Sequence, residues 1–124
     1  MRTRSRTLTE QELEIMKVVW GLKRATVRDV YETLRERRKI AYTTVMTMMN
    51  ILEAKKHLKK RVQDRAYVYQ ATRPRREVIK AMVREFVERV FNGSAEPLLV
   101  HLIKDRQLSQ KDLQKIVRTI EGSE

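Results

Sequence analysis

A row of short polar side chains lies in the one long uncharged segment of this sequence. Asp, Glu, Lys and Arg make up 35% of the chain, yet IAYTTVMTMMNIL, residues 40–52, contains none of them. On a helix, Thr43, Thr47 and Asn50 lie on one side and most of the apolar residues lie on the other. Short hydroxyl and amide groups allow a close approach to a partner and hydrogen-bond to the base edges and phosphates of DNA. The segment therefore predicts a helix with a groove-reading side; the alternative is a core helix whose outer side is rich in threonine.

The positive charge of the chain is concentrated in its first part. Residues 1–76 contain 20 Lys and Arg against 8 Asp and Glu, and residues 77–124 contain 8 of each, so the first part carries the whole net charge of +12. Such asymmetry indicates a half that binds a polyanion and a half with another task. Nucleic acid is the leading partner; an anionic membrane surface and a solvated surface without a partner are the alternatives.

The candidate DNA contacts combine the polar side of the neutral segment, its flanking residues and the cations that follow. Thr44, near the start of the expected helix, is placed to bond a phosphate together with free backbone N–H groups. Lysine and arginine side chains after the helix would add affinity that depends on salt but not on sequence. The complete set is Tyr42, Thr43, Thr44, Met46, Thr47, Asn50, Lys55, Lys56 and Arg65.

Residues 1–7 allow two interpretations. Arg2, Arg4 and Arg6 could form an arm that enters a minor groove, or the segment could be a disordered tail, which is the usual behaviour of termini. The segment is basic but has no apolar stretch of the secretory-signal kind. No apolar run in the chain approaches the roughly 20 residues of a membrane span. We therefore expect a cytoplasmic protein without a membrane partner.

Catalysis has little support in this sequence. There are no cysteines, which excludes disulfides, thiolate metal sites and cysteine nucleophiles. The two histidines are isolated from each other. His57 falls where the neutral helix should end, a position with positive φ that His tolerates, and His101 lies on a leucine-rich segment, where packing or an interface is expected. No glycine-rich phosphate loop, nucleophile elbow or metal-ligand spacing is present, so we expect no enzyme activity, no metal and no cofactor.

The elements that position these groups follow the order of a winged helix-turn-helix. Capping-box pairs at Thr9 and at Thr26 predict two helices before the neutral one, and Gly21 is the expected end of the first. Short runs of β-branched and aromatic residues then predict a basic hairpin with strands over Leu58–Val62 and Tyr67–Ala71. Three helices followed by a hairpin place the third helix in the major groove and the hairpin along the phosphates. The expected fold is mainly α-helical with a small β-hairpin wing.

A second, helical region follows Pro74, which resists helix continuation. We place the domain boundary there, with one domain over 1–74 and the other over 75–124. Apolar residues recur in adjacent pairs through the helix expected before Asn92. They form an apolar face that is too wide for one small partner to cover. Ser94 is the expected cap of a short helix, and Ser109 begins the last one.

Four stretches resemble a known family. LTEQELEIMKVVW, ATVRDVYETL, AYTTVMTMMNIL and LSQKDLQKI are similar to the penicillinase-repressor family of bacterial transcriptional regulators (BlaI, MecI and CopY type), over about residues 7–121. The resemblance implies a homodimeric winged-helix repressor that binds an inverted-repeat operator, often of β-lactamase or other stress-response genes. It also implies that Thr43, Thr44, Thr47 and Asn50 match the recognition-helix positions.

The same resemblance assigns the C-terminal helices to dimerisation and suggests how repression ends. The implied dimer residues are Ile79, Met82, Val83, Phe86, Val87, Val90, Phe91, Leu99, Leu102, Ile103, Leu113, Ile116, Val117 and Ile120. In antibiotic-responsive members a protease cleaves the helix before the LSQ segment, and the matching site here is His101–Leu102. Copper-responsive members carry a cysteine cluster, which this chain lacks, so copper sensing by thiolates is excluded. The chain also has Ala41-Tyr42 in place of a common Ser-Pro, and His57 in place of a common glycine.

The sequence therefore predicts a dimeric repressor that competes with polymerase for a promoter. The first alternative is a non-specific chromatin or RNA-binding protein, which would bind any duplex with a steep dependence on salt. The second is an adaptor whose basic half binds an acidic protein and ignores DNA at physiological salt.

Overall fold

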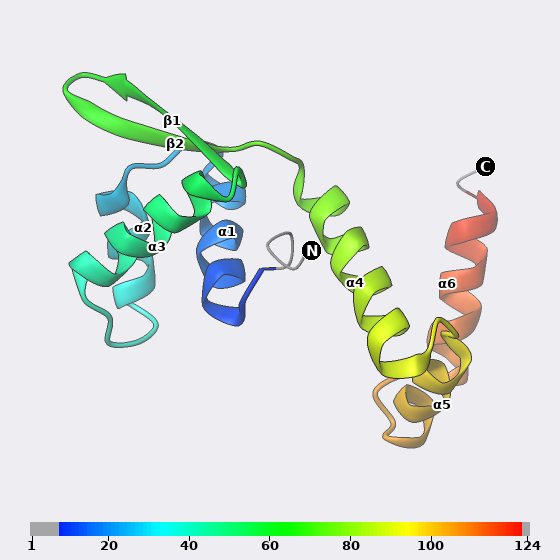
Figure 1. The fold of residues 1–124 in the computed structure, drawn as a ribbon. Helices are drawn as coiled ribbons and strands as arrows, with labels where there is room; N and C mark the ends of the chain where they lie inside the picture. The colour runs from blue at the N-terminus through cyan, green and yellow to red at the C-terminus, as the bar shows by residue number, and fades with distance from the viewer. Residues whose placement is uncertain (1–7, 123–124) are drawn as a thin grey trace. The chain divides into compact units, whose positions relative to one another are not determined.

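The computed structural model describes residues 8–122, so the predicted arm with Arg2, Arg4 and Arg6 lies outside the described residues. Within this range it contains six helices and one two-stranded antiparallel hairpin (Figure 1). In chain order they are α1 (Glu10–Leu22), α2 (Val27–Arg35), α3 (Tyr42–Ala54), β1 (Leu58–Gln63), β2 (Ala66–Ala71), α4 (Arg75–Phe91), α5 (Glu96–Lys104) and α6 (Gln110–Gly122). The predicted fold class, mainly helical with a hairpin wing, is confirmed.

Side-chain caps begin three of the helices as predicted. Thr9 caps α1 and Thr26 caps α2, each in a reciprocal capping box with the acidic residue three positions later. At the start of α6 the Ser109 N–H donates to Asp112 Oδ2 at 3.0 Å, and the Asp112 N–H donates to Ser109 Oγ at 3.1 Å. These contacts satisfy N–H groups that have no partner inside a helix.

Two predicted helix ends are wrong. Helix α1 continues through Gly21 to Leu22, and Lys23 takes the positive φ of 74° that ends it. Ser94 does not cap α5: the N-cap residue is Ala95, which makes no side-chain cap hydrogen bond. Pro97, in the first turn of α5, cannot donate a backbone hydrogen bond and fixes the helical φ there. The start of α5 is therefore set by Pro97 rather than by a side-chain cap.

The first three helices and the hairpin share one core. Its side chains that are exposed by 2% or less are Ile15, Met16, Val19, Ala25, Val30, Leu34, Val45, Met49, Leu52, Leu58 and Tyr69. Tyr69 joins the hairpin to the segment between α1 and α2 through two backbone hydrogen bonds. Its N–H donates to the Ala25 carbonyl oxygen at 2.8 Å, and its carbonyl oxygen accepts from the Ala25 N–H at 3.0 Å. The hairpin is therefore a part of the folded unit and not an appendage.

The hairpin turns through two residues with positive φ. Asp64 has φ 53° and Arg65 has φ 68°, between the paired residues Gln63 and Ala66. This is the geometry of a primed two-residue turn, which matches the right-handed twist of the strands and favours Asn-Gly. Each strand is one residue longer than predicted, and the turn places Arg65 at the tip of the wing.

The chain divides into two compact units, of which the first ends at Met82 and the second begins at Val83. The domain boundary expected from the sequence lies eight residues earlier, after Pro74. The first unit extends into α4 because Val78 is buried in its core and Met82 packs against that core. Trp20 also ties the segment before α4 to the first unit, because its indole N–H donates to the backbone oxygen of Arg73 at 3.1 Å. No side chain among the described residues 83–122 is buried.

One nearly buried ion pair ties the first helix to the end of the third. Lys55 Nζ lies 2.9 Å and 3.1 Å from the two carboxylate oxygens of Glu12, whose side chain is 5% exposed. The same carboxylate accepts the Thr9 N–H of the capping box at 2.9 Å. Burial acts to raise the pKa of Glu12, but the Thr9 N–H, the bond to Lys55, and the charges of Lys55 and His57 outweigh it and lower that pKa.

Replacing Glu12 with Gln should destabilise the first unit by about 1–3 kcal/mol, because Lys55 loses its charged partner and a capping bond weakens. Urea unfolding at neutral pH measures the change. Glu10→Gln is the matched control: Glu10 lies in the same first turn but is exposed, so its effect should stay within about 0.5 kcal/mol.

The same pair predicts an acid-dependent loss of stability. Since the pKa of Glu12 is lower in the folded state than its ordinary value of 4.5, its contribution is complete above pH 4.5 and is lost as the pH falls through the folded value. As the pH is lowered below 5, the free energy of unfolding should therefore fall more for the wild-type protein than for the Glu12→Gln variant. Parallel pH profiles of the two proteins would contradict the assignment.

Candidate nucleic-acid interface

Helix α3 has the two-sided character that the sequence predicts. Val45, Met49 and Leu52 are buried, whereas Thr43, Thr47, Asn50 and Ala54 are exposed. Tyr42, Thr44 and Met46, the flanking residues, are also exposed. The structure therefore brings six of the nine predicted DNA contacts onto the solvent side of one helix, because the apolar side of that helix is needed for the core.

The first turn of α3 is held by aromatic packing instead of a side-chain cap. Its N-cap residue, Ala41, makes no side-chain hydrogen bond. Tyr42 packs edge-to-face on Tyr31 of α2 with ring centroids 5.5 Å apart, and the Arg28 guanidinium lies 5.7 Å from the centre of the Tyr42 ring. Tyr42 thus fixes the start of α3 against α2 and keeps a cation beside the exposed polar side.

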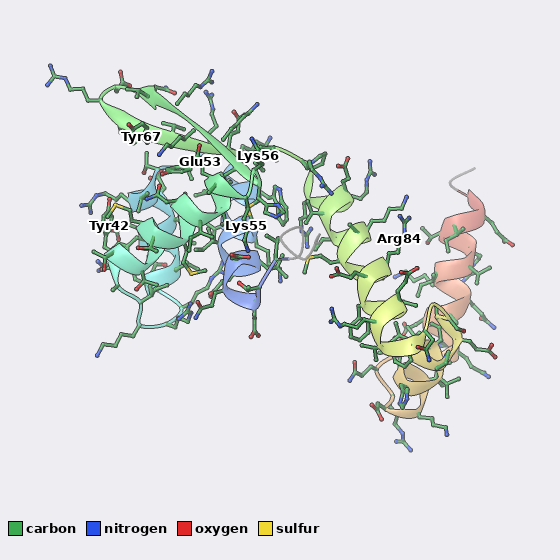
Figure 2. All side chains as sticks on the ribbon, in the orientation of Figure 1. Tyr42, Glu53, Lys55, Lys56, Tyr67 and Arg84 are labelled. Carbon is green, nitrogen blue, oxygen red and sulfur yellow. The ribbon has the colours of Figure 1, made fainter. Side chains whose placement is uncertain are left out.

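At the end of α3 the neighbouring residues Lys55 and Lys56, both predicted as DNA contacts, have different surroundings (Figure 2). Lys55 turns towards Glu12 and is engaged in the internal ion pair, so a phosphate contact by Lys55 stays a prediction. Lys56 is exposed and has φ 70°. The Lys56 N–H bonds to the Glu53 oxygen at 3.0 Å and the His57 N–H to the Leu52 oxygen at 2.9 Å. This pair of bonds is a Schellman end.

The Schellman end corrects one expectation from the sequence about the end of this helix, which stops at Ala54. The positive φ falls on Lys56 and not on His57, whose side chain is buried at 7% exposure. Periodicity alone extends a helix indefinitely, so it could not show where this one stops.

The hairpin supplies a basic surface next to α3. Arg65 is exposed at the wing tip. Lys60 of β1 lies opposite Tyr69 of β2, with its ammonium 4.5 Å from the centre of the Tyr67 ring and 5.9 Å from that of Tyr69. The alternation of the strand puts Lys59 and Arg61 on the other side of the hairpin. Cations therefore cover both sides of the wing.

A hydrogen bond that the sequence does not reveal joins the wing to the polar side of α3. The Tyr69 hydroxyl donates to Asn50 Oδ1 at 3.0 Å. The bond borders a hollow of about 500 Å³ between the start of α2, α3 and the hairpin, lined by Thr26, Val27, Arg28, Tyr42, Met46, Asn50, Lys60, Ala66, Tyr67 and Tyr69. Nineteen residues separate the two partners, and no local pattern pairs them.

Most of the residues predicted for the dimer interface are exposed, and all of them except Ile79 and Met82 lie in the second unit. Val83, Phe86, Val90, Leu99, Ile103, Ile116, Val117 and Ile120 are exposed, and Ile79, Met82, Val87, Phe91, Leu102 and Leu113 are half-buried. Met82 owes part of its burial to the core of the first unit. His101, one side of the predicted cleavage site, is exposed on α5 with its ring 6.1 Å from that of Phe91, and Leu102 is half-buried.

Two kinds of site are missing from the part of the chain that the structure describes. No three His, Asp or Glu side chains of residues 8–122 gather as a metal ion would need. None of the helices in that range has the length and apolar character required to cross a membrane.

The family model and the relatives found by sequence point to one family. The family model described as penicillinase repressor matches residues 8–122. The transcriptional regulator BlaI of Mycobacterium tuberculosis is 37% identical over 100 residues, which are 78% of this chain and 72% of that protein. The penicillinase repressor of Bacillus licheniformis is 24% identical over 114 residues, 92% of this chain and 89% of the relative. Among solved structures, a mutant of Lactococcus lactis ZitR shows a distant likeness, with a TM-score of 0.47 and 10% identity over 98% of this chain and 77% of that one.

The match of the family model spans every helix and both strands of the structure, including the polar side of α3 and the exposed apolar helices of the second unit. The resemblance seen in the sequence is thereby confirmed, and the chain belongs to the penicillinase repressor family.

Proposed function

We propose that this chain represses transcription as a homodimer bound to an inverted-repeat DNA operator. The observation that carries the proposal is the exposed, uncharged polar side of α3 beside a cationic wing. A helix of this kind fits the major groove, where hydroxyl and amide groups reach base edges, and a basic hairpin fits the flanking phosphates. Repression then requires no chemistry, because the bound dimer excludes polymerase from the promoter.

The regulated genes are proposed from the relatives. One relative is named a penicillinase repressor, and others are named methicillin resistance regulatory proteins. We infer that this chain controls a β-lactamase gene or another stress-response gene.

The dimer is proposed from the second unit. Described residues 83–122 bury no side chain, although this stretch contains nine large apolar residues that are exposed. Burying a large apolar side chain is worth about 1.5–3 kcal/mol, and helices of 9 and 13 residues are marginal without packing. A second copy of the chain would cover these faces and bring a second α3 to the DNA, about one helical turn from the first.

Cleavage is the proposed route to induction. A cut between His101 and Leu102 would divide α5 and detach α6 from the rest of the second unit. The half-sites would then be bound independently, and affinity would fall because the second site is no longer presented at a high effective concentration. An inactivating protease is therefore a proposed partner.

Operator recognition is tested by titrating the protein with the promoter fragment of its own gene and with a scrambled duplex of equal length, at two salt concentrations. We expect a preference of roughly a thousandfold for the native fragment, the usual scale for specific binders. Equal affinities that fall together with salt would instead identify a non-specific nucleic-acid binder. A duplex selection from genomic DNA checks whether a weak result reflects the choice of fragment.

Arg65→Gly should separate DNA affinity from stability. Glycine relieves the positive φ at the wing tip, so the free energy of unfolding should stay the same or rise by up to about 1 kcal/mol. Loss of one phosphate contact should weaken binding to all duplexes and reduce the slope of log affinity against log salt by about one. Asp64→Gly is the matched control, because it relieves the same turn without removing a cation. Equal binding by the two variants would remove Arg65 from the interface.

Val83→Glu should disrupt the dimer. Val83 is 52% exposed at the start of the second unit, so a carboxylate there leaves the monomer intact but cannot be buried against a partner. Sedimentation should show monomers at concentrations where the wild-type protein is dimeric, and operator affinity should fall. Lys80→Gln is the control, because it alters an exposed residue of the same helix and lowers the net charge by the same amount as Val83→Glu. A dimeric Val83→Glu protein would mean that the interface lies elsewhere.

A further inference from the structure

The side chain of Asn50 is held by a partner whose own position is fixed by the core. Asn50 lies on the exposed polar side of α3, and its Oδ1 accepts the hydroxyl proton of Tyr69 at 3.0 Å. The Tyr69 ring is 2% exposed, and its backbone is paired with Ala25 on both the N–H and the C=O. The hydroxyl therefore marks a fixed point at the junction of the wing and α3.

The chemistry of the two groups sets the direction of this bond. Burial, and after it the negative charge of Glu53, raises the pKa of Tyr69, so the phenol keeps its proton at neutral pH and has it to donate. An amide oxygen is a stronger acceptor than a phenol oxygen, and an amide nitrogen offers donors only. Asn50 therefore turns its oxygen to Tyr69 and its NH₂ group away from that residue.

This orientation matters for base recognition. A free Asn pairs with adenine in the major groove by accepting from N6 and donating to N7, which uses both ends of the amide. Guanine presents two acceptors at the same edge, N7 and O6. An amide whose oxygen is already engaged and whose NH₂ group carries two donors is better matched to guanine.

Resting on the proposed operator-binding function, we propose that Tyr69 is a positioning residue that fixes Asn50 as a hydrogen-bond donor, so that each α3 reads a guanine at the base pair facing Asn50. Tyr69 does not touch the DNA in this arrangement. It selects the base by deciding which end of the Asn50 amide faces the groove.

The test is a selection of bound duplexes from a randomised half-site library, carried out with four full-length proteins. Asn50→Ala identifies the base pair that faces residue 50, because preference should disappear there alone. Wild type should select guanine over adenine at that position by roughly tenfold, within the range of a good paired contact. Tyr69→Phe keeps the buried ring but frees the amide to rotate, so the preference should fall to within about twofold or pass to adenine.

Tyr67→Phe is the matched control, since Tyr67 lies on the same strand and its exposed ring contacts Lys60. It should keep the guanine preference of the wild type. Thermal unfolding shows whether Tyr69→Phe is folded. A second measurement on the wild-type protein does not depend on that variant: 7-deazaguanine at the same position removes the N7 acceptor and should weaken binding by roughly fivefold, but not for Asn50→Ala.

Three results would overturn the inference. They are a wild-type preference for adenine opposite Asn50, an unchanged guanine preference in folded Tyr69→Phe, and no effect of 7-deazaguanine on the wild-type protein. Each of these leaves sequence-specific binding intact and rejects only the role of Tyr69. Absence of any selected sequence with the wild-type protein is a different result, because it rejects the proposed operator-binding function together with this inference.

Discussion

The candidate DNA-binding surface depends on how the hairpin is held to the helices, and Tyr69 is the residue that holds it. Its backbone pairs with Ala25 between α1 and α2, its ring fills the core, and its hydroxyl reaches Asn50 on α3. A two-stranded hairpin is marginally stable by itself, so the wing keeps a defined place only through such contacts. The cations of the wing and the polar side of α3 are consequently parts of one continuous surface.

The ion pair between Glu12 and Lys55 supports the same surface from its other end. It connects the capping box of α1 with the last turn of α3, so the start of one helix and the end of another are fixed together. A nearly buried pair carries a desolvation cost that offsets much of its attraction. Its contribution is therefore a defined orientation of α3 as much as stability, which suits the proposed contact of α3 side chains with base edges.

The features that could be predicted from the sequence are those set by neighbouring residues. The capping boxes at Thr9 and Thr26 are local, and the two sides of α3 follow from helical periodicity. The bond between Tyr69 and Asn50 and the pair between Lys55 and Glu12 join residues 19 and 43 positions apart. They arise only when the elements pack, so no pattern in the chain indicates them. The extension of the first unit into α4 has the same origin, because it depends on where Val78 is buried.

Among the described residues, four exposed cations have positive φ, which glycine adopts at lower cost: Lys23, Lys56, Arg65 and Arg106. Two of them, Lys56 and Arg65, belong to the candidate DNA-binding surface. Lys56 and Arg65 both have positive φ, near 70°, and a non-glycine residue there costs about 1 kcal/mol. Lys56 ends the helix with the polar side, and Arg65 forms the tip of the wing beside it. A fold selected for stability alone would place glycine or asparagine at both points. In the proposed function, the positive charge of Lys56 and Arg65 at the two ends of this surface would attract a polyanionic partner, and this attraction would offset the cost of the strained backbone there.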